Sequence, residues 1–154
     1  MVNIFSITNS RVKEYLRATP AAAETEQRVD VDYDVEGTGP TVLLLAGLGY
    51  GGWYWRHVRA RLLPHCSVVT VDNCGSDGSE KPAGPYTTAL LAEDPAAVLD
   101  ALGRFSTTVV GRSLGGLIAQ ELAVAPSDLV GCGSQTRMSA PQLESQWSSR
   151  RRPP

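Results

Sequence analysis

The run Gly111-Arg112-Ser113-Leu114-Gly115 places one serine between two glycines, each two residues away. An apolar run precedes it and a helix-like run follows it, so the serine falls at a strand-to-helix turn. Glycines at this spacing let neighbouring backbone pass closely, and a sharp turn lifts the serine hydroxyl clear of the sheet. The amide that opens the helix, that of Leu114, then points to where an oxyanion would develop. The spacing predicts that Ser113 is a nucleophile.

A serine hydroxyl becomes a good nucleophile only when a base accepts its proton. The chain has two histidines, His57 and His65, and both precede Ser113. We expect both histidines to be surface residues rather than the base. The acidic residues after Glu121 are Asp128 and Glu144, and neither stands where the acid of a catalytic triad is expected. The sequence therefore predicts a nucleophile whose acid and base are missing from this chain.

Apolar runs and helical periodicities alternate along the middle of the chain. Residues 29–35 alternate valine or tyrosine with acidic residues, which predicts a half-solvated, antiparallel edge strand. Continuous apolar runs predict buried strands at 41–47, 67–72 and 106–110, and helical patterns cover 53–63, 87–102 and 114–125. Pro95 should kink or split the second helix. The order predicts an α/β fold, with a doubly wound, mostly parallel sheet of about five strands.

Ligands of such sheets bind beyond the carboxyl ends of the strands. Residues 46–52, 72–79 and 111–115 all follow predicted strands. We therefore expect these three segments to converge on one site.

Three stretches together resemble the α/β-hydrolase superfamily, in its serine-nucleophile branch of esterases, lactonases and cofactor-free haloperoxidases. They are "LLLAGLGYGGWYW", "VDNCGSDGSEKP" and "VVGRSLGG". The resemblance implies that Ser113 attacks the carbonyl of an ester or lactone and that the backbone amides of Leu48 and Leu114 hold the oxyanion. It implies no cofactor and no metal, and a small ester-like molecule as substrate. A serine rather than an aspartate at position 113 disfavours the dehalogenase and epoxide-hydrolase branches.

The chain departs from the pattern of that family at several positions. Ala46 stands where the family usually has histidine, Cys74 where it has arginine, and Asp77 where it has glycine. No histidine follows Ser113, although the family order is serine, acid, histidine. We therefore expect the amino-terminal part of a hydrolase fold, with activity impaired or absent.

Two other functions remain open. Gly47, Gly49 and Gly52 fit the G-x-G-x-x-G pattern of a dinucleotide-binding turn, and Asp72 ends the next strand, where an acid would bind a ribose hydroxyl. Against this, the bulky residues 53–55 occupy the start of the helix, where a pyrophosphate favours small residues. The remaining alternative is a non-catalytic truncated fragment that binds a partner or folds poorly.

We divide the chain into a loosely structured segment (1–25) that includes a short helix at 11–18, a partial hydrolase domain (26–130) and a disordered tail (131–154). The tail has too few apolar residues to offset its ordering entropy. Strand 106–110 would then be an apolar sheet edge, which favours self-association.

Apolar residues make up 42% of the chain, charged residues 19%, and the net charge is −2. Such a composition does not favour binding to nucleic acid or to an anionic membrane. The chain start lacks a signal peptide pattern, and no apolar stretch has the length of a membrane-spanning helix. We expect a cytoplasmic protein.

Overall fold

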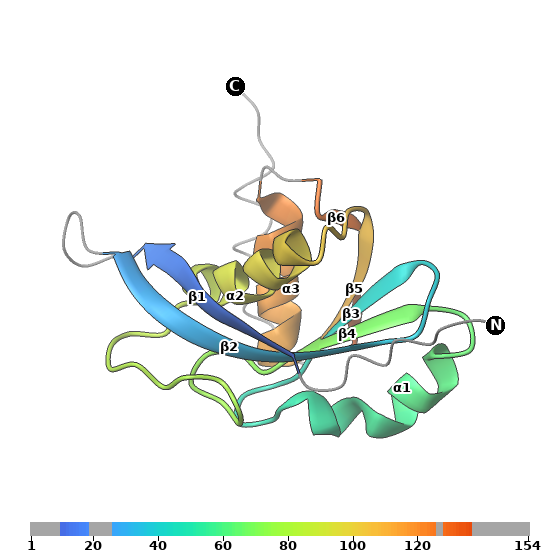
Figure 1. The fold of residues 1–154 in the computed structure, drawn as a ribbon, viewed down its shortest axis with the longest axis horizontal. Helices are drawn as coiled ribbons and strands as arrows, with labels where there is room; N and C mark the ends of the chain where they lie inside the picture. Colours follow the sequence, from blue (N-terminus) through green and yellow to red (C-terminus); the bar gives the residue numbers. More distant parts are fainter. Residues whose placement is uncertain (1–9, 19–25, 126–127, 137–154) are drawn as a thin grey trace.

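The computed structural model describes residues 10–18, 26–125 and 128–136. Six strands form one sheet, and they are β1 (Ser10–Ala18), β2 (Glu26–Glu36), β3 (Thr41–Leu45), β4 (Ser67–Val71), β5 (Thr107–Arg112) and β6 (Val130–Thr136). The helical elements are the 3₁₀ helix η1 (Gly52–Trp55), α1 (Arg56–Leu62), α2 (Thr88–Ala101) and α3 (Leu114–Val124). Helix α1 lies on one face of the sheet, and α2 and α3 lie on the other (Figure 1).

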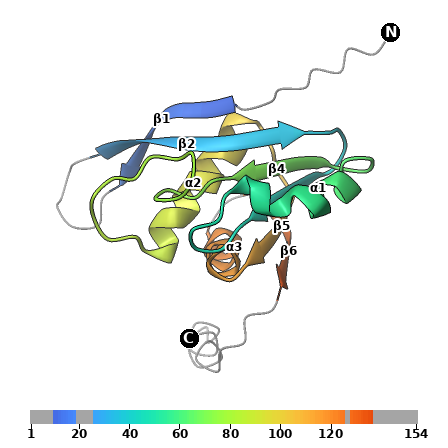
Figure 2. The same cartoon turned by 90° about the horizontal axis from the view of Figure 1, so that it is seen from below.

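The strand order is β1-β2-β4-β3-β5-β6. Strands β4, β3, β5 and β6 run parallel, while β2 is antiparallel to both of its neighbours. Figure 2 shows β1, β2 and β4 following one another across the sheet. The predicted α/β class, with a doubly wound and mostly parallel sheet, is confirmed, and the sheet has six strands instead of about five.

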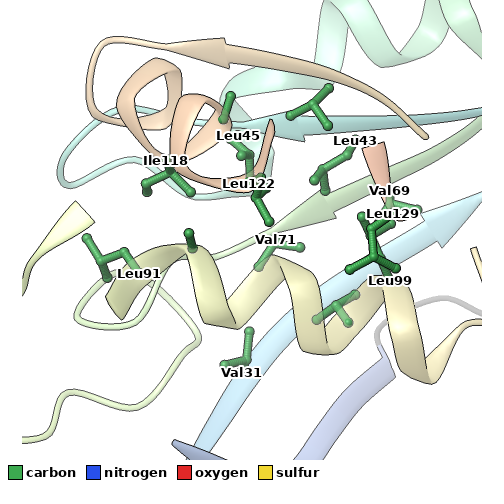
Figure 3. Packing of buried hydrophobic residues seen from close by; sticks show 14 of the residues in the cluster. Val31, Leu43, Leu45, Val69, Val71, Leu91, Leu99, Ile118, Leu122 and Leu129 are labelled. Carbon is green, nitrogen blue, oxygen red and sulfur yellow. The ribbon is translucent and has the colours of Figure 1, made fainter. Parts of the chain in front are cut away.

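The central strands bury both of their faces, as their continuous apolar sequence predicts. Alternate residues of β3 point to opposite sides: Leu43 and Leu45 pack with α2 and α3, whereas Leu44 packs on the α1 side. The larger core lies between the sheet and the pair α2–α3 (Figure 3). Complete burial of a leucine side chain stabilises the fold by about 1.5–3 kcal/mol. The α2–α3 face holds more of the buried apolar residues than the α1 face, so it supplies most of the stabilisation from apolar burial.

Helix α2 begins with a side-chain cap, because the Thr87 hydroxyl accepts a hydrogen bond from the Leu90 amide at 3.1 Å. Pro95 lies inside this helix, which continues as one element from Thr88 to Ala101 instead of splitting in two. Among the described helices, none is long and apolar enough to span a membrane.

The short helix predicted at 11–18 is wrong, because these residues form β1. Strand β1 pairs antiparallel with β2, from Ser10 opposite Tyr33 to Ala18 opposite Glu26. Strand β2 is therefore antiparallel as predicted but is not at the edge of the sheet. A long main-chain ladder outweighs the weak helical preference of so short a segment.

The prediction that strand 106–110 is a sheet edge is also wrong. Strand β6 pairs in parallel with β5, with Thr108 opposite Cys132 and Arg112 opposite Thr136. Main-chain hydrogen bonds form this ladder, and they do not require the apolar side chains that residues 131–136 lack. The rest of the predicted tail, 137–154, lies outside the described residues, as do 1–9 and 19–25. The boundaries at residues 26 and 130 stay predictions, although β1 and β6 extend the sheet beyond them.

Candidate active site

Ser113 lies between β5 and α3 in an unusual backbone conformation. Its φ is +53° and its ψ is −121°, and it is the N-cap residue of α3. Residues other than glycine rarely adopt such angles, and this conformation costs of order 1–3 kcal/mol. The side chain is exposed and does not cap the helix. The turn thus leaves Ser113 exposed at the junction of β5 and α3, and the predicted strand-to-helix turn is present.

The two glycines that flank Ser113 are required by close backbone packing. A methyl group on Gly115 would lie 2.1 Å from the Leu45 carbonyl oxygen. A methyl group on Gly111 would lie 2.2 Å from the Gly115 carbonyl oxygen. Both separations are far shorter than any van der Waals contact. The first turn of α3 therefore packs directly on the end of β3, and this packing fixes where Ser113 projects.

The loop after β3 passes beside Ser113. A methyl group on Gly47 would lie 3.4 Å from Cβ of Ser113 and 3.9 Å from its Oγ. The loop folds back as a turn in which the Tyr50 amide donates to the Gly47 carbonyl at 3.1 Å. Leu48, in the middle of this turn, exposes 76% of its surface. Leu48 therefore follows directly on Gly47, the residue of this loop that passes beside Ser113.

The first amides of α3 follow Ser113 directly in the chain. The Ser113 carbonyl accepts from the amides of Gly116 at 2.8 Å and Leu117 at 3.3 Å, which closes the first turn of the helix. Leu114 is the first residue of α3. Amides at this position have no acceptor within the helix and favour an anion.

The third predicted segment, after β4, is held by Asp72. One of its carboxylate oxygens accepts from the Gly52 amide at 2.7 Å and the other from the Gly78 amide at 3.0 Å. Burial raises the pKa of Asp72, while these two hydrogen bonds oppose the shift. The residue thus ties the loop after β4 to the start of η1.

These contacts disfavour the dinucleotide alternative. Each oxygen of Asp72 already accepts from a backbone amide, so the carboxylate holds the loop together instead of pointing freely toward a ribose. The Gly52 amide, which would face a pyrophosphate, donates to that same carboxylate. Space beside Gly51 is filled by the carboxylates of Asp72 and Asp77, which would repel a phosphate.

Comparison with known proteins gives the family. Residues 40–142 match the family model described as alpha/beta hydrolase fold. The chain belongs to the α/β-hydrolase fold family. This match covers the three segments that follow the predicted strands, residues 46–52, 72–79 and 111–115.

Two curated relatives match much of this chain. It is 37% identical over 101 residues to a protein of Azorhizobium caulinodans named "Putative carbamate hydrolase RutD", a match that covers 66% of this chain and 38% of that protein. It is 38% identical over 104 residues to a protein of Mycobacterium tuberculosis named "Putative non-heme bromoperoxidase BpoC", covering 66% of this chain and 39% of that protein. The chain therefore spans less than half the length of either relative.

Among solved structures, a thermophilic esterase from Thermogutta terrifontis superposes with a TM-score of 0.72 at 25% identity. The superposition covers 89% of this chain and 50% of the esterase chain. The partial hydrolase fold predicted from the sequence is thus confirmed.

Among the described residues, neither histidine forms a hydrogen bond with Ser113. His57 in α1 and His65 after it are exposed, as predicted, and in the part of the chain that the structure describes the Ser113 hydroxyl has no hydrogen-bond partner. Asp128 is exposed, and Glu144 lies outside the described residues. Nor do the described ranges hold a cluster of three or more His, Cys, Asp or Glu side chains suited to a metal.

The positions that depart from the family pattern have clear structural roles. The Ala46 carbonyl accepts from the Asn73 side-chain amide at 3.4 Å, which links the ends of β3 and β4. Cys74 is buried, and its amide donates to Asp94 at 2.9 Å. Asp77 has a φ of +39°, a conformation that glycine adopts without strain.

Sequence reasoning missed Asp94 and the partner of Arg112. Asp94 is fully buried in α2, and burial raises its pKa to about 7. Its spacing from Leu91 and Val98 along one helix face was an available signal. The guanidinium of Arg112 stacks over the ring of Tyr54 at 4.8 Å from the centroid, a contact between distant segments that no local pattern indicates.

Proposed function

We propose that this chain carries the nucleophile and the oxyanion-binding amides of a serine hydrolase that acts on carboxylic esters or lactones. The observation that supports it most is the conformation of Ser113, a strained and exposed serine at the start of a helix, beside Gly47. Strain of this kind is kept where surrounding structure enforces it, and it concentrates at active sites. The likeness to an esterase supports an ester substrate.

In the proposed reaction, Oγ of Ser113 attacks the carbonyl carbon and loses its proton to a base. The carbonyl oxygen becomes an oxyanion, which accepts hydrogen bonds from the amides of Leu48 and Leu114. Collapse of this intermediate expels the alcohol, which takes up a proton, and leaves Ser113 acylated. Water then adds to the acyl group by the same route and releases the acid.

No base is hydrogen-bonded to Ser113 in the ranges that the structure describes. Its two histidines are exposed in and just after α1. We therefore expect the isolated chain to form a covalent adduct slowly and to turn over poorly. An oxyanion site alone still accelerates acyl transfer by about 10³-fold in a serine protease that lacks its triad, so slow but selective reaction at Ser113 is the expected behaviour.

A fluorophosphonate probe tests this proposal. The Ser113 oxygen bonds to phosphorus, fluoride leaves, and the proton passes to solvent base. Ser106 is the matched control, because it is also exposed and also has a positive φ, of +52°. We expect Ser113 to be labelled at least about tenfold faster than Ser106, with no loss of this labelling in Ser106→Ala. Equal labelling of the two serines, or labelling unaffected by Ser113→Ala, contradicts the proposal.

A further inference from the structure

The two proposed oxyanion-binding amides belong to segments that are distant in sequence. Leu48 follows β3, whereas Leu114 opens α3 after β5. An oxyanion hole works only when its donors are held about 2.7–3.1 Å from one position, so the spacing between the two segments must be fixed. In this chain Ala46, next to the loop, replaces the histidine that the family pattern has there.

A stack of aromatic rings joins the loop to η1. The ring of Tyr50 lies 5.3 Å from that of Tyr54 in an edge-on arrangement, and 5.6 Å from that of Trp53. Tyr54 in turn lies 5.1 Å from Trp55, which is buried beneath it. Tyr50 thus ends the turn that contains Leu48, and Tyr54 is anchored to the core through Trp55.

Arg112 connects this stack to the serine. It is the residue before Ser113, and its guanidinium lies 4.8 Å from the ring centre of Tyr54 and 6.0 Å from that of Tyr50. In the described part of the chain Arg112 forms no ion pair. Both distances fall within the range of a cation–π interaction, which a planar guanidinium makes better than an ammonium.

We propose that Arg112 is a positioning residue, which sets the spacing between the loop that carries Leu48 and the turn that carries Ser113 by stacking on Tyr54. This role rests on the proposed function, because it matters chemically only if the two segments hold an oxyanion. The contact itself is independent of the reaction. It acts on the same two segments that come close at Gly47, where an added methyl group would lie 3.4 Å from Cβ of Ser113.

The Tyr50 amide reports on the loop without any chemistry at Ser113. It is hydrogen-bonded to the Gly47 carbonyl, so its hydrogen exchange measures how often the turn opens. Arg112→Met removes the cation and keeps the length of the side chain. We expect it to accelerate exchange of this amide about two- to fivefold, the effect of losing one exposed cation–π contact.

Matched variants separate stacking from general damage. Tyr54→Phe keeps the ring and should leave exchange within about 1.5-fold of the original, whereas Tyr54→Leu should accelerate it at least as much as Arg112→Met. Arg112→Lys keeps the charge and should restore part of the protection. In the double variant Arg112→Met/Tyr54→Leu, the Tyr50 amide should exchange no faster than in Tyr54→Leu alone, because Tyr54→Leu has already removed the contact with Arg112.

The role of Arg112 is overturned if exchange of the Tyr50 amide is unchanged in Arg112→Met. It is also overturned if the accelerations by Arg112→Met and Tyr54→Leu multiply in the double variant. Fluorophosphonate labelling provides the second readout, with each variant first checked by circular dichroism to be folded. Arg112→Met should slow labelling of Ser113, and Arg112→Lys should recover part of that rate. Labelling that stays at the original rate while the turn opens more often also overturns the positioning role. If Ser113 is never labelled but the exchange pattern is as expected, the proposed hydrolase function fails and the stacking contact between Arg112 and the loop stands.

Discussion

Replacing Gly115 by alanine tests the packing that forms the serine turn. The added methyl group would lie 2.1 Å from the Leu45 carbonyl oxygen and 2.6 Å from that of Ala46. Contacts between carbon and oxygen normally begin above 3 Å, so the first turn of α3 would have to move away from β3 by about 1 Å. Neither obstacle is a flexible side chain, because both are backbone atoms, one in the last residue of β3 and one in the residue after it. Overpacking of this kind costs about 1–3 kcal/mol, and rigid backbone puts this site at or above the upper limit.

The neighbouring residue, Gly116, is the matched control. A methyl group there would meet its nearest atom, the Gly111 carbonyl oxygen, at 3.5 Å, which is an ordinary contact. Alanine is favoured over glycine inside a helix by up to about 1 kcal/mol. Gly116→Ala should therefore leave the free energy of unfolding unchanged or raise it. The two variants differ by one position and should differ in stability by about 3–4 kcal/mol.

Urea denaturation followed by circular dichroism measures both free energies of unfolding. The fluorophosphonate probe then measures whether Ser113 keeps its reactivity. We expect Gly115→Ala to lose stability and labelling together and Gly116→Ala to keep both. Equal stability of the two variants would refute the inference that contact between α3 and the end of β3 holds the turn.

Three further predictions follow from strain, burial and ion pairing. Ser113→Gly should raise the free energy of unfolding by about 1–2 kcal/mol, because glycine adopts a φ of +53° without strain. Ser113→Ala should not raise it, and urea denaturation of both variants measures the difference. Burial raises the pKa of Asp94 from 3.8 to about 7, so the folded state holds this proton more tightly and stability should fall by up to about 4 kcal/mol as pH rises from about 4 to 7. Denaturation across that range should show most of the fall lost in Asp94→Asn, the remainder coming from Asp72, whose pKa burial also raises. The fall should be kept in Asp100→Asn, whose side chain is exposed on the same helix, and a flat profile in the original chain would contradict the prediction. Arg59 pairs with two carboxylates of β2, so Arg59→Gln should lower the free energy of unfolding by about 1–2 kcal/mol. Arg61 is exposed, and Arg61→Gln should change it by less than about 0.5 kcal/mol. Similar losses in both variants would refute a role for the pairing.

The central strands and the serine turn were predictable because their signals are local. The apolar runs that became β3 and β4 bury both faces, and that of β5 buries one face fully and the other partly, so most of their residues independently favour a strand. The glycines around Ser113 were predictable for the same reason, since each one marks a close approach of backbone. The converging loops follow from the parallel arrangement of these strands.

The two outer strands were missed because pairing with a neighbour determines them. Residues 11–18 and 131–136 lack a clear period of two, and they become strands by adding backbone hydrogen bonds to β2 and β5. The contact of Arg112 with Tyr54 joins residues 58 positions apart by numbering, so composition and periodicity contain no trace of it. Asp94 is buried only because α2 packs against the sheet, a contact between elements that lies outside any local pattern.

The direct contact between α3 and the end of β3 has an evolutionary consequence. Carbonyl oxygens and glycines set the direction of the Ser113 hydroxyl, and neither depends on the identity of the surrounding side chains. Mutations can therefore reshape the neighbouring surface, where Leu48 and Trp53 are exposed, without disturbing the serine turn. An architecture of this kind can diversify in what its surface recognises while inheriting unchanged the backbone geometry of the turn that we propose carries the nucleophile.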